Sequence, residues 1–153
     1  MLPFYVWADN SQVGQWMRGN SWAFPSVETV HILALAAMLG TLFLIDLRLM
    51  GIAARGLTPS HMHRQLKSFF NWGLLVMLVT GFLLFLSEAL KAYDNDAFRP
   101  KMITLMMAIV FHYTVHKKAV ESGTSAVWRK LVGALSVVLW FGVGAFGRAI
   151  GFL

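Results

Sequence analysis

The chain has 153 residues, of which 58% are hydrophobic and 13% are charged, and its mean hydropathy is +0.63. A soluble domain of this size has about half apolar and about a quarter charged residues, so this composition favours a membrane protein. The lack of cysteine excludes disulfides, thiolate ligands and cysteine redox chemistry, and the net charge of +6 is explained by membrane topology rather than by nucleic-acid binding.

The first 22 residues are expected to lie at a membrane interface. They lack a basic start and an unbroken apolar core, which argues against a cleavable secretory signal. Trp7, Trp16 and Trp22 are typical of an interfacial segment, because tryptophan prefers the headgroup level of a bilayer.

Four apolar segments follow, and they predict helices over about 25–50, 59–91, 99–120 and 125–151. A membrane-spanning helix needs roughly 20 residues, and the first, second and fourth segments meet this length. The third has only fifteen uncharged positions between Lys101 and Lys117, so it crosses only if both lysines reach outward. We expect an all-α integral membrane four-helix bundle that forms one transmembrane domain over residues 1–153.

Basic residues are more numerous on two of the connections than at the chain ends. The first connection is flanked by Arg48, Arg55, Arg64 and Lys67, and the third by Lys117, Lys118, Arg129 and Lys130. The positive-inside rule therefore predicts both termini on the outer side of the membrane, which is the periplasmic side in a Gram-negative cell. The expected location is the bacterial inner (plasma) membrane, with several crossings.

Four of the five histidines lie inside these apolar segments or at their edges. His31 lies in the first segment, His63 leads into the second, and His112 and His116 close the third. An ionisable side chain at membrane depth is costly and often functional, and imidazole is a common ligand of haem iron and other metals. These four histidines are therefore candidate cofactor or metal ligands.

The inner histidines allow a shared site. His112 and His116 are spaced i, i+4, so they share one helix face. Pairing of His63 with either of them would hold a haem or metal near the inner surface. Alternatively, His61, His63 and His116 are ordinary interfacial polar residues.

Asp46 lies near the inner end of the first helix, where a carboxylate would need a partner. Arg129, Lys130 and a histidine nitrogen are candidates, and we favour a structural ion pair. On the second helix, the buried side is expected along Met62, Leu66, Phe69 and Phe70.

The outer end offers a second candidate site. Glu28 and His31 are spaced i, i+3, as in di-iron bundles, but the chain lacks the second copy that this chemistry needs. Arg148 is a candidate partner of Glu28 or of a haem propionate. An outer haem would need a second axial ligand besides His31, for which Met38, Met102 and Met106 are candidates by residue type.

Two stretches resemble a known family. They are Trp22-Ala23-Phe24-Pro25, continuing to Glu28 and His31, and Asp46-Leu47-Arg48-Leu49-Met50-Gly51. Over the first third of the chain they are similar to a bacterial family of small four-helix membrane proteins of unknown function. The architecture is also similar to small b-type cytochromes, including the cytochrome b561-like group, which exchanges electrons with quinone. Unlike that group, this chain shows no two bis-histidine pairs at matched depths.

The leading functional hypothesis is a small membrane haem b protein that transfers electrons, with quinone or another redox protein as its partner. His63, His112, His116 and His31 are its candidate ligands, and Arg148 is a candidate propionate partner. The alternatives are binding or transport of copper or another transition metal, and a cofactor-free accessory subunit whose histidines pack or relay protons. Small residues on the fourth helix would permit an oligomer. No nucleic-acid module or phosphate-binding loop is present in the sequence.

Overall fold

The computed structural model describes residues 2–53, 56–122 and 124–150, and every regular element in these ranges is helical. The elements are α1 (Leu2–Asp9), α2 (Gln12–Gly19), α3 (Ala23–Leu49), α4 (Pro59–Ser87), α5 (Ala89–Asp94), α6 (Phe98–Phe111), the π-helical turn η1 (His112–His116), α7 (Lys117–Glu121) and α8 (Ala126–Ala149). The expected all-α class is confirmed for these residues.

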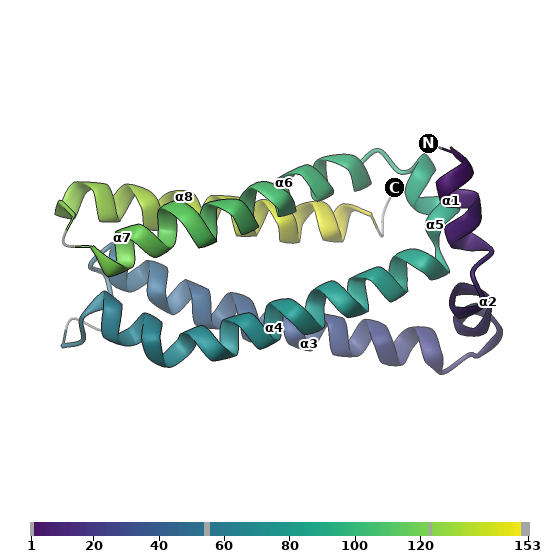
Figure 1. Cartoon of the computed structure of the whole chain (residues 1–153), viewed down its shortest axis with the longest axis horizontal. Coiled ribbons are helices and arrows are strands. Elements are labelled where there is room, and N and C mark those ends of the chain that lie inside the picture. Colours follow the sequence, from purple (N-terminus) through teal and green to yellow (C-terminus); the bar gives the residue numbers. More distant parts are fainter. Residues whose placement is uncertain (1, 54–55, 123, 151–153) are drawn as a thin grey trace.

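The long helices run side by side as two pairs, α3 with α4 and α6 with α8 (Figure 1). Contacts between α3 and α8 join the pairs. The main core lies where the pairs meet and contains Met38, Leu42, Phe70, Leu74, Met77, Ala108, Trp140 and Val143. The start of α1 and the end of α8 lie at one end of the bundle, beside α5, and we call this the terminal end. The opposite end, where α3 ends and α8 begins, carries Arg48, Arg64, Lys67, Lys117, Lys118, Arg129 and Lys130, and we call it the basic end.

Local signals explain where the helices start and stop. The Thr58 hydroxyl accepts a hydrogen bond from the His61 backbone N–H at 3.3 Å, and Pro59 occupies the first turn of α4. The Ser125 hydroxyl caps α8 in the same way by accepting from the Trp128 backbone N–H. After α3, Gly51 has a φ of 78°, a left-handed conformation that glycine adopts without steric strain.

Among the described residues, three helices are long and apolar enough to cross a membrane, namely α3, α4 and α8. Their outward faces carry large exposed apolar side chains, which include Ile32, Leu33, Trp72, Leu75, Val138 and Phe141. Such extensive apolar exposure is unfavourable in water and suits contact with lipid. Phe69 is exposed as well, so its expected place on the buried side of α4 is wrong, whereas Met62 and Phe70 are buried.

Two of the helices differ from the sequence expectation. A single helix was expected over 59–91, but α4 ends at Ser87 because Glu88 leaves the helical conformation, with φ of −135° and ψ of 34°. The expected third helix over 99–120 is a continuous helical stretch that contains the π-helical turn. Arg55 and residue 151, which the sequence places in the first connection and at the end of the fourth helix, lie outside the described residues.

The amino-terminal segment packs over the terminal end of the bundle. The Tyr5 ring lies 5.6 Å from that of Phe85 and 5.2 Å from that of Tyr93, measured between centroids. The Arg18 guanidinium donates to the Ser87 carbonyl at 2.7 Å, which ties α2 to the end of α4. Trp7, Trp16 and Trp22 remain exposed, a distribution that suits an interface.

The contact between α2 and α4 depends on Gly14, and alanine there is expected to destabilise the protein. A Cβ atom at Gly14 would lie 2.3 Å from the Leu86 carbonyl oxygen, so the two backbones would have to move apart. We expect Gly14→Ala to lower the free energy of unfolding by about 1–3 kcal/mol. Thermal unfolding in detergent, followed by circular dichroism, measures this loss.

Gly19→Ala is the matched control, because a Cβ at Gly19 on the same helix meets nothing within 4 Å. Equal melting temperatures for the two variants would contradict the close packing of α2 on α4.

Candidate functional site

Four titratable side chains meet inside the bundle near the basic end. They are Asp46 from α3, His63 from α4, and His112 and His116 from η1, and all four are buried. We call these residues the histidine cluster. The structure therefore brings together the three inner histidines of the sequence analysis and adds the nearby acid.

Asp46 and His116 form the most deeply buried polar pair of the cluster. The His116 Nε2 atom lies 2.6 Å from Asp46 Oδ1, and the two side chains are 0% and 1% exposed. Of the partners considered for Asp46, the structure selects a histidine nitrogen. When Asp46 is ionised its carboxylate can only accept, so His116 Nε2 then donates the hydrogen of this bond. The buried Ser136 hydroxyl of α8 lies close to the Asp46 carboxyl group.

His112 lies between aromatic neighbours that fix its ring plane. Its ring stacks on that of Phe70 with centroids 4.0 Å apart, and on that of His116 with centroids 5.0 Å apart. The His63 ring lies 6.5 Å from the His112 ring and is tilted by 43°. The Tyr113 hydroxyl donates to Asn71 Oδ1 at 2.9 Å and ties the η1 turn to α4. The two helices that supply His63 and His112 are thus linked next to the cluster.

The π-helical turn spans the segment from His112 to His116. The backbone N–H of Lys117 donates to the His112 carbonyl, five residues earlier, and also to the Thr114 carbonyl, three residues earlier. Single π turns are rare and occur frequently at functional sites. Here the turn begins and ends on the two cluster histidines, and both are buried.

Three ring nitrogens in the cluster lack a hydrogen-bond partner. They are the Nδ1 atoms of His63, His112 and His116, and all are buried. Buried polar atoms are nearly always satisfied, so these three point to an interaction that the protein atoms do not supply. Within the described residues, no group of three or more histidine, aspartate or glutamate side chains is arranged to hold one metal ion.

His31 lies in a separate place, on α3 toward the terminal end. Its Nδ1 atom lies 2.9 Å from the Thr80 hydroxyl, which itself donates its hydrogen to the Val76 carbonyl at 2.6 Å. Thr80 must therefore accept at His31, so Nδ1 carries the hydrogen and Nε2 of the neutral ring holds the lone pair. The Lys101 ammonium group lies near enough to act on the ring electrostatically.

The other outer candidates differ in how deeply they are buried. Glu28 and Arg148 are exposed at the terminal end of α3 and α8. Met102 and Met106 are exposed on the outward side of α6, whereas Met38 is fully buried in the main core. His61 is only half-buried in the first turn of α4.

Sequence reasoning missed Thr80, Phe70 as a stacking partner and Ser136 as a neighbour of Asp46. A usable signal existed for the two hydroxyl residues, because each is a polar side chain in a long apolar segment. Nothing in the sequence marks the π-helical turn, because its residues are also compatible with an α-helix.

Neither a curated protein nor a solved structure matches this chain. A family model described as a family of unknown function, DUF6644, matches residues 4–153. The match covers nearly the whole chain and agrees with the resemblance to an uncharacterised family that the first third of the sequence indicates. The chain therefore belongs to the DUF6644 family.

Proposed function

We propose that this protein is a small membrane haem b protein that transfers electrons, with His63 and His112 as the axial ligands. The observation that carries the proposal is the spacing of these two imidazoles. A ligating nitrogen lies about 2 Å from its metal, so the centroids of two rings on one metal lie about 6 Å apart. The observed separation of the His63 and His112 centroids is 6.5 Å.

The number of available ligands favours haem over an ion bound by protein alone. A structural metal ion such as zinc takes four ligands, and a catalytic one takes three. Haem brings its own four nitrogens and asks only one or two axial ligands of the protein. A pair of histidines on facing helices, without a cluster of three among the described residues, fits that smaller requirement.

The surrounding residues would hold the ligands of the haem in place. Phe70 packs on His112 and limits rotation of its ring, while the bond from His116 to Asp46 fixes the other end of the η1 turn. These contacts would limit the movement of the surrounding side chains when the charge of the site changes. When bound, haem supplies reversible one-electron oxidation and reduction, with a potential set by its ligands and by burial.

The membrane arrangement is part of the proposal. The α6, η1 and α7 segments form one continuous helical stretch from Phe98 to Glu121, about 35 Å long at 1.5 Å per residue, and would be the fourth crossing. Ile103, Met106, Met107 and Val110 are exposed apolar residues on this stretch, as expected for lipid contact. The basic end would face the cytoplasm of a bacterial cell, with both termini outside the inner membrane.

An optical spectrum tests the proposal directly. Protein expressed with ample haem and purified in detergent is expected to show a Soret band, and dithionite reduction should sharpen and shift the visible bands as in bis-histidine haem. A protein that is folded by circular dichroism but has no Soret band would contradict the haem assignment.

Binding of copper or another transition metal is the second candidate. It is favoured by the three buried Nδ1 atoms without partners, because imidazole nitrogens are good copper ligands. Elemental analysis of the same sample separates the two: iron with a porphyrin spectrum supports haem, and copper or zinc without one supports a metal site. If both are absent, the result favours the cofactor-free accessory subunit.

A further inference from the structure

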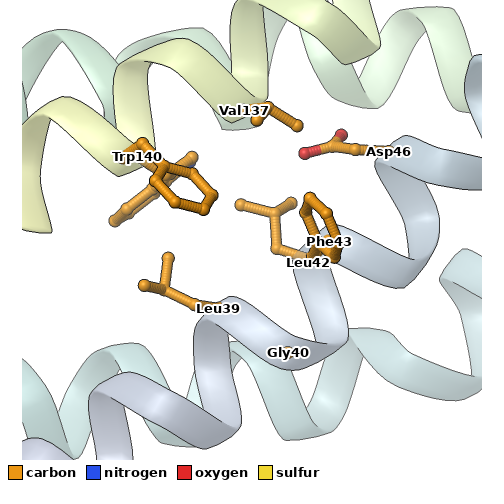
Figure 2. A pocket seen from close by; sticks show the side chains of 8 residues that line it. Leu39, Gly40, Leu42, Phe43, Asp46, Val137 and Trp140 are labelled. Atoms are coloured by element: carbon orange, nitrogen blue, oxygen red, sulfur yellow. The ribbon is translucent and has the colours of Figure 1, made fainter.

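An open pocket lies between α3 and α8 on the side of the bundle where Asp46 is found (Figure 2). Its volume is about 220 Å³. Apolar side chains form most of its wall, namely Leu39, Leu42, Phe43, Val137, Trp140 and Phe141. The acidic group in this wall is the Asp46 carboxyl group, which points from α3 toward α8 in Figure 2, and the Trp140 indole Nε1 is buried without a hydrogen-bond partner in the described residues.

The pocket opens toward the region where lipid would lie. Phe43 and Phe141, which face each other with centroids 6.4 Å apart, are both exposed on the outward side of their helices. Gly40 also lines the pocket, and a Cβ atom built there meets nothing within 4 Å. A ligand dissolved in the membrane could therefore enter without crossing water, and a chain attached to it could remain among the lipid tails.

The size of the pocket suits one six-membered ring. An apolar protein cavity of about 150 Å³ is large enough to bind benzene, so about 220 Å³ leaves room for a ring with small substituents. Aromatic rings at Phe43, Trp140 and Phe141 offer edge and face contacts to such a ring. A porphyrin is much larger, so this pocket is distinct from the haem position proposed above.

The Asp46 carboxyl group sets the chemistry of the occupant. A carboxylate has about four acceptor positions, of which His116 Nε2 uses one and the nearby Ser136 hydroxyl can use another. A carboxylate with acceptor positions left over beside an apolar pocket favours a ligand that brings a hydrogen-bond donor. A phenolic hydroxyl on an aromatic ring supplies this donor together with the apolar surface that the rest of the wall requires.

We propose that this pocket binds the ring of a lipid-soluble phenol or hydroquinone, whose hydroxyl donates a hydrogen bond to Asp46. The proposal goes beyond the proposed function and does not require haem. An acyl chain of a lipid or a second copy of this chain would fill the apolar part but would leave the remaining acceptor positions of the carboxyl group unused. Preference for the hydroxyl therefore identifies the occupant.

The test compares two ligands that differ only in that hydrogen. Binding of 4-methylphenol and of its methyl ether, 4-methylanisole, is measured by equilibrium dialysis against the protein in lipid nanodiscs, with empty nanodiscs as background. We expect saturable binding of the phenol and at least about tenfold weaker binding of the ether, because the hydrogen bond to the Asp46 carboxyl group is lost.

Two glycine variants locate the site. Gly40→Leu places a side chain in the open space of the pocket and is expected to weaken phenol binding at least about tenfold. Gly144→Leu is the matched control, because a Cβ at Gly144 on α8 also meets nothing within 4 Å and Gly144 does not line this pocket. Its binding should equal that of the unaltered protein.

Three results would overturn the proposal: no saturable binding, equal binding of phenol and ether, or unchanged binding in Gly40→Leu. Haem content is measured in the same samples. A sample that lacks haem yet binds the phenol keeps the pocket assignment and contradicts only the electron-transfer function, so the two proposals fail separately.

Discussion

Replacing Asp46 by leucine is expected to lower the free energy of unfolding by about 3–5 kcal/mol. The substitution removes the only acceptor shown for His116 Nε2 in the described residues, and the imidazole is 0% exposed. His116 would then have both ring nitrogens buried without a partner, since its Nδ1 already lacks one. Leaving a buried polar group unpaired costs more than the hydrogen bond itself contributes. Thermal or denaturant-induced unfolding in detergent measures the effect.

Two further variants distinguish the loss of the Asp46–His116 hydrogen bond from a general loss of packing. Asp46→Asn keeps an acceptor oxygen and is expected to lose only about 1 kcal/mol. The double variant Asp46→Leu with His116→Leu removes both polar groups and should recover most of the loss, because apolar replacement of a buried pair is often neutral or stabilising. If Asp46→Leu melted at the same temperature as the unaltered protein, the buried pair would not be a stabilising contact.

The partner of Asp46 shows where sequence reasoning reaches its limit. A lone acid near the end of an apolar helix must be satisfied, so the need for a partner follows from desolvation alone. Which of Arg129, Lys130 or a histidine supplies it depends on how α3 meets η1, across 70 residues of chain. Pairing of His31 with Thr80, 49 residues apart, was unpredictable for the same reason.

The positions of the long helices were easier to predict than the irregularities within them. Apolar length and the prolines at 25, 59 and 100 locate the long helices to within a few residues, as the observed start of α4 at Pro59 illustrates. The break at Glu88 and the π-helical turn change hydrogen bonding without a matching change in composition. Phe69 was misplaced because the buried stripe of α4 runs through Met62, His63 and Phe70, which leaves Phe69 on the lipid side.

The largest effect on cofactor content is expected from the two proposed axial ligands. His63→Ala and His112→Ala should each lower haem affinity by at least about 100-fold, because changes to residues that merely orient a ligand already cost about 10- to 100-fold. The physical reason is that each variant leaves one axial position of the iron without a protein nitrogen. The ratio of Soret to protein absorbance, measured after purification in detergent, reports the loss.

Three comparisons test whether the loss of haem comes from the loss of an iron ligand. His31→Ala is the matched histidine control, because its ring bonds to Thr80 away from the cluster, and it should retain haem. Asp46→Asn should weaken binding by only about tenfold, since Asp46 acts through His116. Added imidazole should restore the low-spin spectrum of His112→Ala, which a purely structural role of His112 would not produce. If both His63→Ala and His112→Ala retained haem, this histidine pair would not hold the iron. In the described residues, no other contacting pair of histidine rings joins two different helices.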